Sequence, residues 1–154
     1  MEAKYNVYDI ANWFLSKESM TPKKLQKMIY YAYAWYLTIA NDPEGQVCSK
    51  LFDSRIEAWV HGPVIPEIYA KYKPYGYNEI DKFDEHETFD YNTENILDQV
   101  FKVYNDFDGN ELESITHQEL PWINARNGAE PLESSHNEIR DKDIIKCYSS
   151  RIAD

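Results

Sequence analysis

The sequence predicts a mainly α fold, a compact single domain over residues 1–154 that is organised around a central buried helix at about residues 21–40. The chain has 154 residues, the size of one ordinary domain. Residues 21–40 are apolar on nearly all sides of a helical wheel, which is typical of a helix buried in the middle of a domain. Elsewhere, apolar and other side chains alternate along residues 51–60, which indicates one short extended or β segment.

The N-terminal part of the chain predicts two helices. The first, at about residues 7–17, follows Asn6, whose side chain can cap a helix N-terminus. The second begins at Thr21 and Pro22, because threonine is a good N-cap and proline fits the first helical position. Residues 41–46 are expected to form the turn that ends this second helix.

A tightly restricted stretch follows the predicted strand at residues 51–60. Gly62 gives the backbone a freedom that other residues lack, whereas Pro63 and Pro66 fix φ and remove a donor. Pro66 is expected to start a helix at residues 66–73. The stretch between the strand and this helix is therefore predicted to form a shaped corner, with these three residues as its structural motif.

An acidic loop and a further helix are predicted next. Residues 79–91 carry six acidic side chains against Lys82 and show no apolar period, so we expect them to form a loop. A helix at about residues 93–107 follows, with Thr93 as its expected N-cap.

The last part of the chain predicts two more helices. Asn110 and Glu113 resemble a capping box and are expected to begin the first of them. Pro121 disfavours helical backbone at the preceding residue, so this helix is expected to end there. Pro121 is the fourth residue of the structural motif. Residues 125–131 are interpreted as a loop, and the last helix is expected near residues 141–150.

The net charge of −11 lies in the second half of the chain. Residues 78–154 carry 19 acidic and 7 basic side chains, whereas residues 1–77 carry 8 and 9. A strongly acidic half repels nucleic-acid phosphate and anionic lipid, and it attracts a basic partner. Nucleic-acid binding through this chain alone is therefore disfavoured. An acidic surface that serves solubility alone remains an alternative.

The chain is rich in tyrosine, with 13 of them among an aromatic content of 15%. Tyrosine suits an interaction surface because it adds contact area and keeps a polar tip, but it also suits the half-buried boundary of a core.

Cys48 and Cys147 have no metal or redox spacing, which indicates free thiols in a reducing compartment. Without a secretory pattern or a long apolar run, we expect a cytoplasmic protein that does not enter a membrane.

The chain has four histidines, which are His61, His86, His117 and His136. None of them has a second histidine at the i, i+4 spacing that is typical of a zinc-binding helix. His61 and His117 each lie beside a proline-bounded corner, so a metal or acid–base site is conceivable where they meet a carboxylate. The favoured alternative is that each ring braces its corner through hydrogen bonds. Since nucleophile motifs and phosphate loops are also absent, we expect no catalytic residue, no metal and no cofactor.

Three lysines, Lys23, Lys24 and Lys27, occupy the first turns of the predicted central helix. Cations at this end oppose the helix dipole, which predicts an acidic neighbour in the C-terminal half of the chain or on a partner.

Three motifs follow one another along the chain. Residues 25–30 read LQKMIY, residues 57–64 read EAWVHGPV with PEIY at 66–69, and residues 116–126 read THQELPWINAR. In this order the motifs resemble the Panacea domain family (DUF4065, the SocA-like and GepA-like phage-associated antitoxin proteins). The resemblance runs from about residue 11 to residue 148.

The resemblance implies an antitoxin that neutralises a cognate protein toxin, encoded beside it on a prophage or another mobile element, by direct binding. A host protease is a second implied partner, because some members deliver the toxin to one as adaptors. Many members carry an additional DNA-binding domain, and we expect no separate one here. The alternatives are a prophage-encoded transcription regulator and, less favoured, a histidine-based metal-dependent enzyme. The oligomeric state is left open.

The residues expected to bind the partner come from the motifs and are Lys27, Trp59, His61, His117, Trp122 and Arg126. We hypothesise a steric mechanism, in which an aromatic-rich surface with an acidic rim occludes a toxin that is basic or binds a negatively charged ligand.

Overall fold

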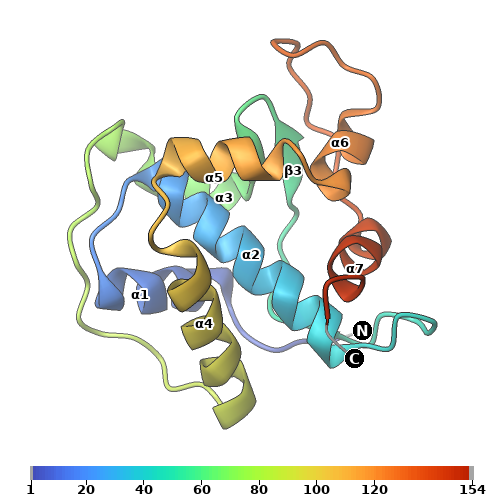
Figure 1. The fold of residues 1–154 in the computed structure, drawn as a ribbon. Coiled ribbons are helices and arrows are strands. Elements are labelled where there is room, and N and C mark those ends of the chain that lie inside the picture. The colour runs from blue at the N-terminus through green and yellow to red at the C-terminus, as the bar shows by residue number, and fades with distance from the viewer. Residues whose placement is uncertain (1, 153–154) are drawn as a thin grey trace.

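The computed structural model describes residues 2–152 and confirms the mainly α fold (Figure 1). Within these residues no helix combines the length and the apolar character that crossing a membrane requires. The helices are α1 (Val7–Lys17), α2 (Pro22–Ala40), α3 (Pro66–Tyr72), α4 (Tyr91–Tyr104), α5 (Gly109–Thr116), α6 (Leu120–Arg126) and α7 (Asp141–Ser149), with a 3₁₀ turn at Lys73–Tyr75.

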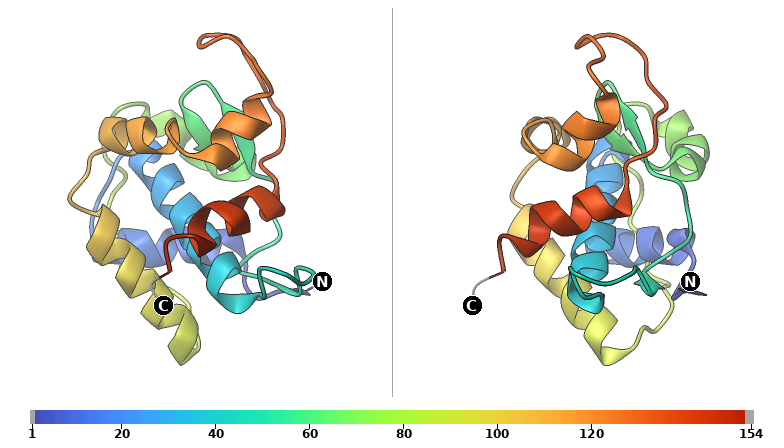
Figure 2. Two further views of the ribbon diagram at one scale, coloured as in Figure 1. Left: turned by 45° about the vertical axis from the view of Figure 1, so that its right-hand side comes forward. Right: turned by 90° about the vertical axis from the view of Figure 1, so that its right-hand side faces the viewer.

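Helix α2 is the centre of the fold, as the sequence predicts. It runs through the middle of the molecule in Figures 1 and 2, with α1, α4, α5 and α7 around it. Its N-terminus forms as expected, because Pro22 is its first residue and the Thr21 side chain accepts a hydrogen bond from the Lys24 N–H at 3.2 Å. Thirteen of its nineteen residues are buried, so most of its stability comes from packing on several sides.

The strands form two small separate sheets. Strand β1 (Glu2–Ala3) pairs in parallel with β2 (Ser49–Lys50), and β3 (Glu57–Trp59) pairs antiparallel with β4 (Gly62–Val64). The corner predicted around residue 62 is thus a β-hairpin.

The extended segment expected at residues 51–60 is shorter than predicted. Only β3, residues 57–59, is hydrogen-bonded to β4. The backbone near Asn137 and Ile139 supplies a further pairing partner. The Ala58 N–H donates to the Asn137 carbonyl and the Ile139 N–H to the Ile56 carbonyl, each at 2.8 Å.

The start of α4 differs from the prediction. Asp90, and not Thr93, is the N-cap, and its carboxylate accepts hydrogen bonds from both the N–H (3.0 Å) and the hydroxyl (2.9 Å) of Thr93. Aspartate and threonine both favour this position, and the carboxylate prevails here because it also accepts a 2.6 Å hydrogen bond from Tyr5. Residues 79–89 form the loop that was expected, apart from a single bridge between Ile80 and Met20.

Helix α5 begins two residues earlier than the sequence suggested. Asp108 and Glu111 form the reciprocal capping box, in place of the predicted pair Asn110 and Glu113. Each pair has the same spacing, but the carboxylate of Asp108 is the stronger acceptor. Glu113 is thereby free to face α2.

The prediction for Pro121 is wrong. Proline there does not end a helix but occupies the second position of α6, where no intrahelical N–H donor is needed. Residues 125 and 126, interpreted as loop, are the last two residues of this helix. The residue that follows them, Asn127, is the C-cap and has a left-handed conformation (φ 51°). Figures 1 and 2 show the segment between α6 and α7 projecting from the body of the molecule.

One buried carboxylate joins three helices behind the hairpin. Glu119, just before α6, accepts hydrogen bonds from the hydroxyl groups of Tyr31 in α2 (2.9 Å) and Tyr148 in α7 (2.7 Å). Its other oxygen lies 2.8 Å from Arg151. A buried carboxylate needs such partners to offset its desolvation, so this cluster fixes how α6 and α7 dock on α2.

Candidate partner-binding site

The first turns of α2 hold β4 and the connection from β4 to α3 through two consecutive residues. Gln26 is buried and bonds Ile65 twice, since its amide donates to the Ile65 carbonyl (3.1 Å) and its oxygen accepts from the Ile65 N–H (2.9 Å). The ammonium of Lys27 donates to the Pro63 carbonyl at 3.2 Å. The LQK motif therefore satisfies backbone groups that the short β4 strand leaves unpaired.

Gly62 is required at the turn of the hairpin for two reasons. Its φ of +109° is a conformation that side chains disfavour. A Cβ atom there would lie 2.9 Å from Cε of Lys27, closer than real Cβ atoms approach, and 3.0 Å from the hydroxyl of Thr116, which is a very tight contact. The glycine thus lets the hairpin contact both α2 and α5.

Helix α6 holds the other strand of the hairpin. The indole N–H of Trp122 donates to the Trp59 carbonyl at 2.8 Å, and the guanidinium of Arg126 donates to the Ala58 carbonyl at 3.3 Å. Arg126 is buried, and it also bonds the carbonyls of Glu130 (2.8 Å) and Glu133 (2.7 Å) in the projecting segment. The motif at residues 116–126 therefore fixes both β3 and the base of that segment.

His117 packs within this arrangement by stacking, and not through the hydrogen bonds that were expected for the histidines, since its buried Nε2 has no partner among the described residues. Its ring stacks on Trp122 with centroids 3.9 Å apart and planes 12° from parallel. Burial lowers the pKa of His117, so the neutral ring is favoured. Trp122 also carries the guanidinium of Arg126 at 5.3 Å from its ring centroid.

Glu113 is the acidic neighbour that the lysines of α2 predicted, and it comes from the same chain. One carboxylate oxygen lies 2.8 Å from the ammonium of Lys23, and the other lies 3.2 Å from Nδ1 of His61. Burial raises the pKa of Glu113, but the hydrogen bonds from Lys23 and His61 outweigh burial and lower it overall. Glu113 is therefore charged at neutral pH and fixes His61 at the rim of the hairpin.

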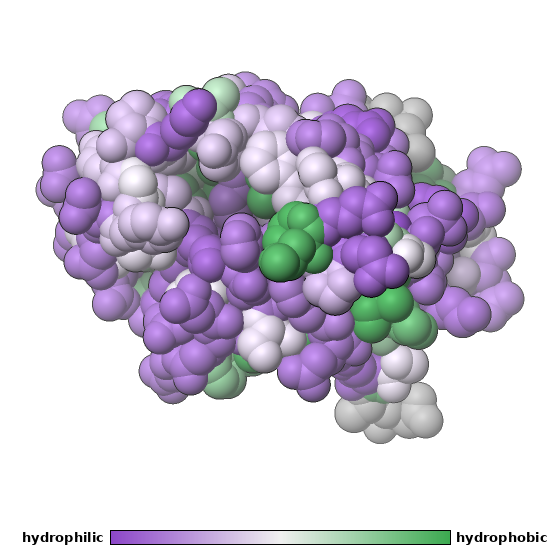
Figure 3. Space-filling view, turned by 90° about the horizontal axis from the view of Figure 1, so that it is seen from above, coloured by the Kyte–Doolittle hydropathy of each residue, from purple (hydrophilic) through white to green (hydrophobic). Residues whose placement is uncertain are grey.

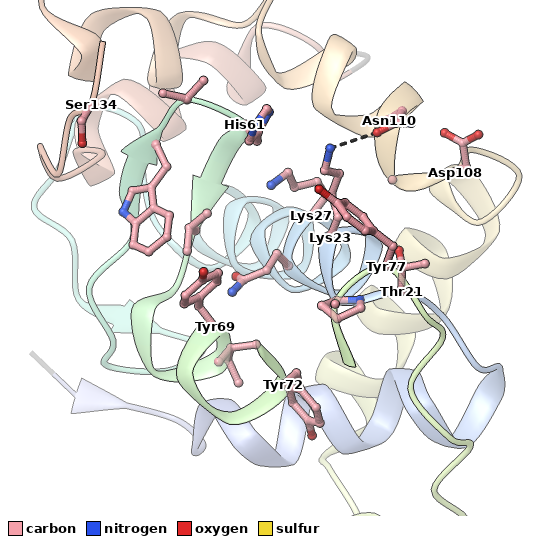
Figure 4. Close-up of a pocket in the computed structure, with 18 of the residues that line it drawn as sticks. Thr21, Lys23, Lys27, His61, Tyr69, Tyr72, Tyr77, Asp108, Asn110 and Ser134 are labelled. Carbon is pink, nitrogen blue, oxygen red and sulfur yellow. Dashed lines mark hydrogen bonds between the residues drawn. The ribbon is translucent and has the colours of Figure 1, made fainter. Parts of the chain in front are cut away.

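A groove of about 660 Å³ opens beside the hairpin. It lies between the start of α2, the hairpin, α3, the start of α5 and residues 134–136 of the projecting segment (Figure 4). Seen from above in Figure 3, this face is mostly hydrophilic, with residues of intermediate hydropathy around a hollow. The side chains that form the walls include Trp59, Val64, Ile68, Tyr69, Tyr72 and Tyr77.

One aromatic wall of the groove is held in place by Trp59. Its ring packs edge-on against Tyr69 at 5.0 Å and against His136 at 5.4 Å. Its indole N–H donates to Glu57 at 2.9 Å, and the same carboxylate oxygen lies 3.2 Å from Nδ1 of His136. Burial opposes the ionisation of Glu57, but hydrogen bonds from Trp59, Arg55 and His136 lower its pKa overall.

Lys27 lies at the floor of the groove and is only 1% exposed. Burial lowers its pKa to about 7, although the charge of Glu113 acts in the opposite direction. A lysine this deeply buried is rare unless its charge is paired at close range. Figure 4 shows its side chain pointing into the pocket beneath His61.

The structure places the six predicted partner-binding residues in two groups. Lys27, Trp59 and His61 line the groove, whereas His117, Trp122 and Arg126 form the support behind the hairpin. Of the structural motif, Gly62 and Pro63 lie in β4, and each of the other two prolines lies in the first turn of a helix.

Sequence reasoning missed several residues that line the groove. They are Tyr69, Tyr72 and Tyr77 together with Asp108 and the segment 134–136. The PEIY motif was the available signal for Tyr69, but nothing local indicated that residues 134–136 return to the hairpin. Within residues 2–152, no three histidine, cysteine or acidic side chains are grouped so that they could hold a metal ion.

Fold and groove together define a mainly helical protein in which three sequence motifs support one hairpin beside an aromatic surface groove. The chain belongs to the family described as antitoxin SocA-like, Panacea domain, whose family model matches residues 25–123. The match spans α2 from Leu25 onward, the hairpin, α3, α4, α5 and the first residues of α6, so it covers all the motifs named above apart from residues 124–126. Neither the curated proteins nor the solved structures gave a significant match.

Proposed function

We propose that this protein is the antitoxin of a toxin–antitoxin pair and that it neutralises its cognate toxin by binding it directly at the groove. The observation that carries this proposal is a groove of about 660 Å³, walled by aromatic side chains, in a chain of the SocA-like antitoxin family. Such a family has a toxin as its general partner, and enriched tyrosine and tryptophan are a property of protein interfaces.

The aromatic side chains at the groove are available to a partner. Tyr77 is 96% exposed and Tyr69 is 41% exposed, and both line the groove with the half-buried Trp59. Large exposed aromatic groups beside a concave surface favour a binding site, because the partner's side chains can fill the hollow and exclude water.

The hydrogen bonds that support the hairpin on both strands favour this site. Backbone carbonyls on both strands are bonded by Lys27 and Arg126, so Trp59 and His61 are held before a partner arrives. Preorganised residues lose little entropy on binding, which favours a tight complex. The net charge of −11 would steer a basic toxin toward the molecule and speed its approach.

Co-expression in a heterologous host tests the proposal. The product of the neighbouring open reading frame should arrest growth when expressed alone, and this protein should restore growth. Tyr77→Ala should weaken the rescue, whereas Tyr91→Ala should not, because Tyr91 is a comparably exposed tyrosine (83%) at the start of α4 and does not line the groove. Failure of the unaltered protein to restore growth would rule out the antitoxin function, and equal rescue by both variants would place the toxin elsewhere on the surface.

Delivery of the toxin to a host protease is a variant of the same proposal. In that case the toxin level should fall only in a host that has the protease, whereas steric neutralisation leaves the toxin level unchanged. Immunoblots of the toxin in hosts with and without their major cytoplasmic proteases separate the two mechanisms.

A further inference from the structure

The lining of the groove holds a lysine that the fold leaves without a carboxylate partner, in a molecule that is acidic as a whole. The chain has a net charge of −11, yet the residues that line the groove include two lysines and two histidines against a single carboxylate, that of Asp108. Asp108 is already engaged, since its side chain caps α5 by accepting from the Glu111 N–H at 2.8 Å. Glu113 pairs with Lys23 and His61, and Glu57 pairs with His136. Among the described residues, Lys27 is therefore the lining cation that has no carboxylate within salt-bridge distance.

The lysine at the floor is not fully used by the fold. An ammonium has three N–H donors, and the ammonium of Lys27 makes one hydrogen bond, to the Pro63 carbonyl at 3.2 Å. The nearest carboxylate, that of Glu113, is already bonded to Lys23 and lies against His61. A side chain that is 99% buried, points into a pocket and keeps unused donors indicates that an acceptor is brought to it by a ligand.

We propose that the groove binds a segment of the partner that places a carboxylate over Lys27 and Lys23 and an adjacent aromatic or aliphatic side chain against the wall formed by Trp59 and Tyr69. This inference rests on the proposed function and adds the chemistry of the contact. The carboxylate would complete the hydrogen bonds of Lys27, and His61, whose side chain is 67% exposed, would cover it from the rim.

The apolar wall and the basic floor favour this kind of segment over a uniformly charged one. The wall consists of rings held edge to face, as between Trp59 and Tyr69 (5.0 Å), which leaves a ring face for an apolar side chain. A basic segment would bring no acceptor to the unused donors of Lys27 and would leave them unpaired.

Fluorine NMR on the protein labelled with 5-fluorotryptophan tests the proposal without any toxin. The Trp59 resonance is assigned from its loss in Trp59→Phe. The probes are two capped dipeptides, acetyl-Phe-Glu-amide and acetyl-Phe-Gln-amide, which have the same shape and differ in charge. We expect the glutamate peptide to shift the Trp59 resonance at a concentration about tenfold lower than the glutamine peptide, as one charge-assisted hydrogen bond supplies.

Two variants show whether the lysines cause this preference. Lys27→Met keeps the length and apolar stem of the side chain and should abolish the preference for glutamate, and Lys23→Met, at a partly exposed position, should reduce it. Lys102→Met is the matched control, because Lys102 is exposed on α4 and does not line the groove, and it should leave the preference unchanged.

Three results would overturn the proposal. They are equal binding of the two peptides, no binding of either at millimolar concentration, and a glutamate preference that survives in both Lys27→Met and Lys23→Met. Because the probes are peptides, these results do not depend on whether the protein rescues growth. The groove chemistry and the antitoxin function can therefore fail separately.

Discussion

Replacing Lys27 by methionine should stabilise the protein at neutral pH. The side chain is 1% exposed, and burial lowers its pKa from 10.5 to about 7. In the unfolded chain the amine keeps its proton up to about pH 10.5, so between pH 7 and pH 10.5 the unfolded state binds more protons than the folded state. The contribution of Lys27 to the free energy of unfolding therefore becomes more favourable as the pH rises across this window.

The magnitude follows from the size of this pKa difference. A fall from 10.5 to about 7 corresponds to about 5 kcal/mol of destabilisation that is fully present below pH 7 and relieved as the pH rises toward 10.5. Methionine removes this penalty but leaves the Pro63 carbonyl without its donor, at a cost of about 1–3 kcal/mol. We therefore expect Lys27→Met to be more stable by about 2–4 kcal/mol at pH 7.

Urea unfolding curves at pH 6, 7, 8 and 9 provide the assay, with the unaltered protein and Lys27→Met measured side by side. The difference between the two proteins cancels the titration of the other groups and should shrink by up to about 1.4 kcal/mol per pH unit above pH 7. A variant that is less stable than the unaltered protein at every pH would refute the reasoning. So would two curves that run parallel with pH.

Four further substitutions probe the support of the hairpin, the docking of the helices and the cap of α5. Gly62→Ala should lower the free energy of unfolding by about 2 kcal/mol or more in urea titrations, since it forces a strained φ and a clash, and an unchanged midpoint would contradict the close approach to Lys27. Glu119→Ala should cost about 2–4 kcal/mol by leaving the buried Tyr31 hydroxyl without an acceptor and Tyr148 with only its 3.4 Å contact to the Tyr30 hydroxyl, whereas loss of the more exposed partner in Arg151→Ala should cost about 1 kcal/mol or less; equal losses would be inconsistent with this assignment. Asp108→Ala should cost about 1 kcal/mol through loss of the N-cap of α5, measured as a lower Tm, and no change in Tm would argue against that cap.

Two of the prolines show how far local sequence rules reach. Pro66 and Pro121 both lie in the first turn of a helix, but only the first was interpreted in that way. The rule that proline ends a helix and the rule that proline begins one apply equally to Pro121. The choice between them depends on the turn at residues 116–119, which is fixed by the contacts of Glu119 with α2 and α7 and not by neighbouring sequence.

The central helix was predictable because its signals are local. Thr21, Pro22 and the apolar run that follows lie within twenty residues of one another, and each favours the same helix. The N-caps of α4 and α5 were misassigned because several side chains near each start can cap, and the choice among them depends on neighbours such as Tyr5.

The candidate site was predictable only in part. The motifs indicated Trp59 and His61, and the lysines of α2 indicated an acidic neighbour, which is Glu113. The burial of Lys27 could not be foreseen, because lysine is normally exposed and its bond to Pro63 joins residues 36 positions apart. The aromatic walls likewise come from segments that meet only in the folded chain.

Binding of the purified neighbouring gene product to the purified protein, measured by isothermal titration calorimetry, tests the antitoxin proposal most directly. We predict a complex that forms with the unaltered protein and with Tyr91→Ala, and that is at least about tenfold weaker with Tyr77→Ala or Tyr69→Ala. Absence of any heat of binding with the unaltered protein, under conditions in which both proteins are folded, would contradict it.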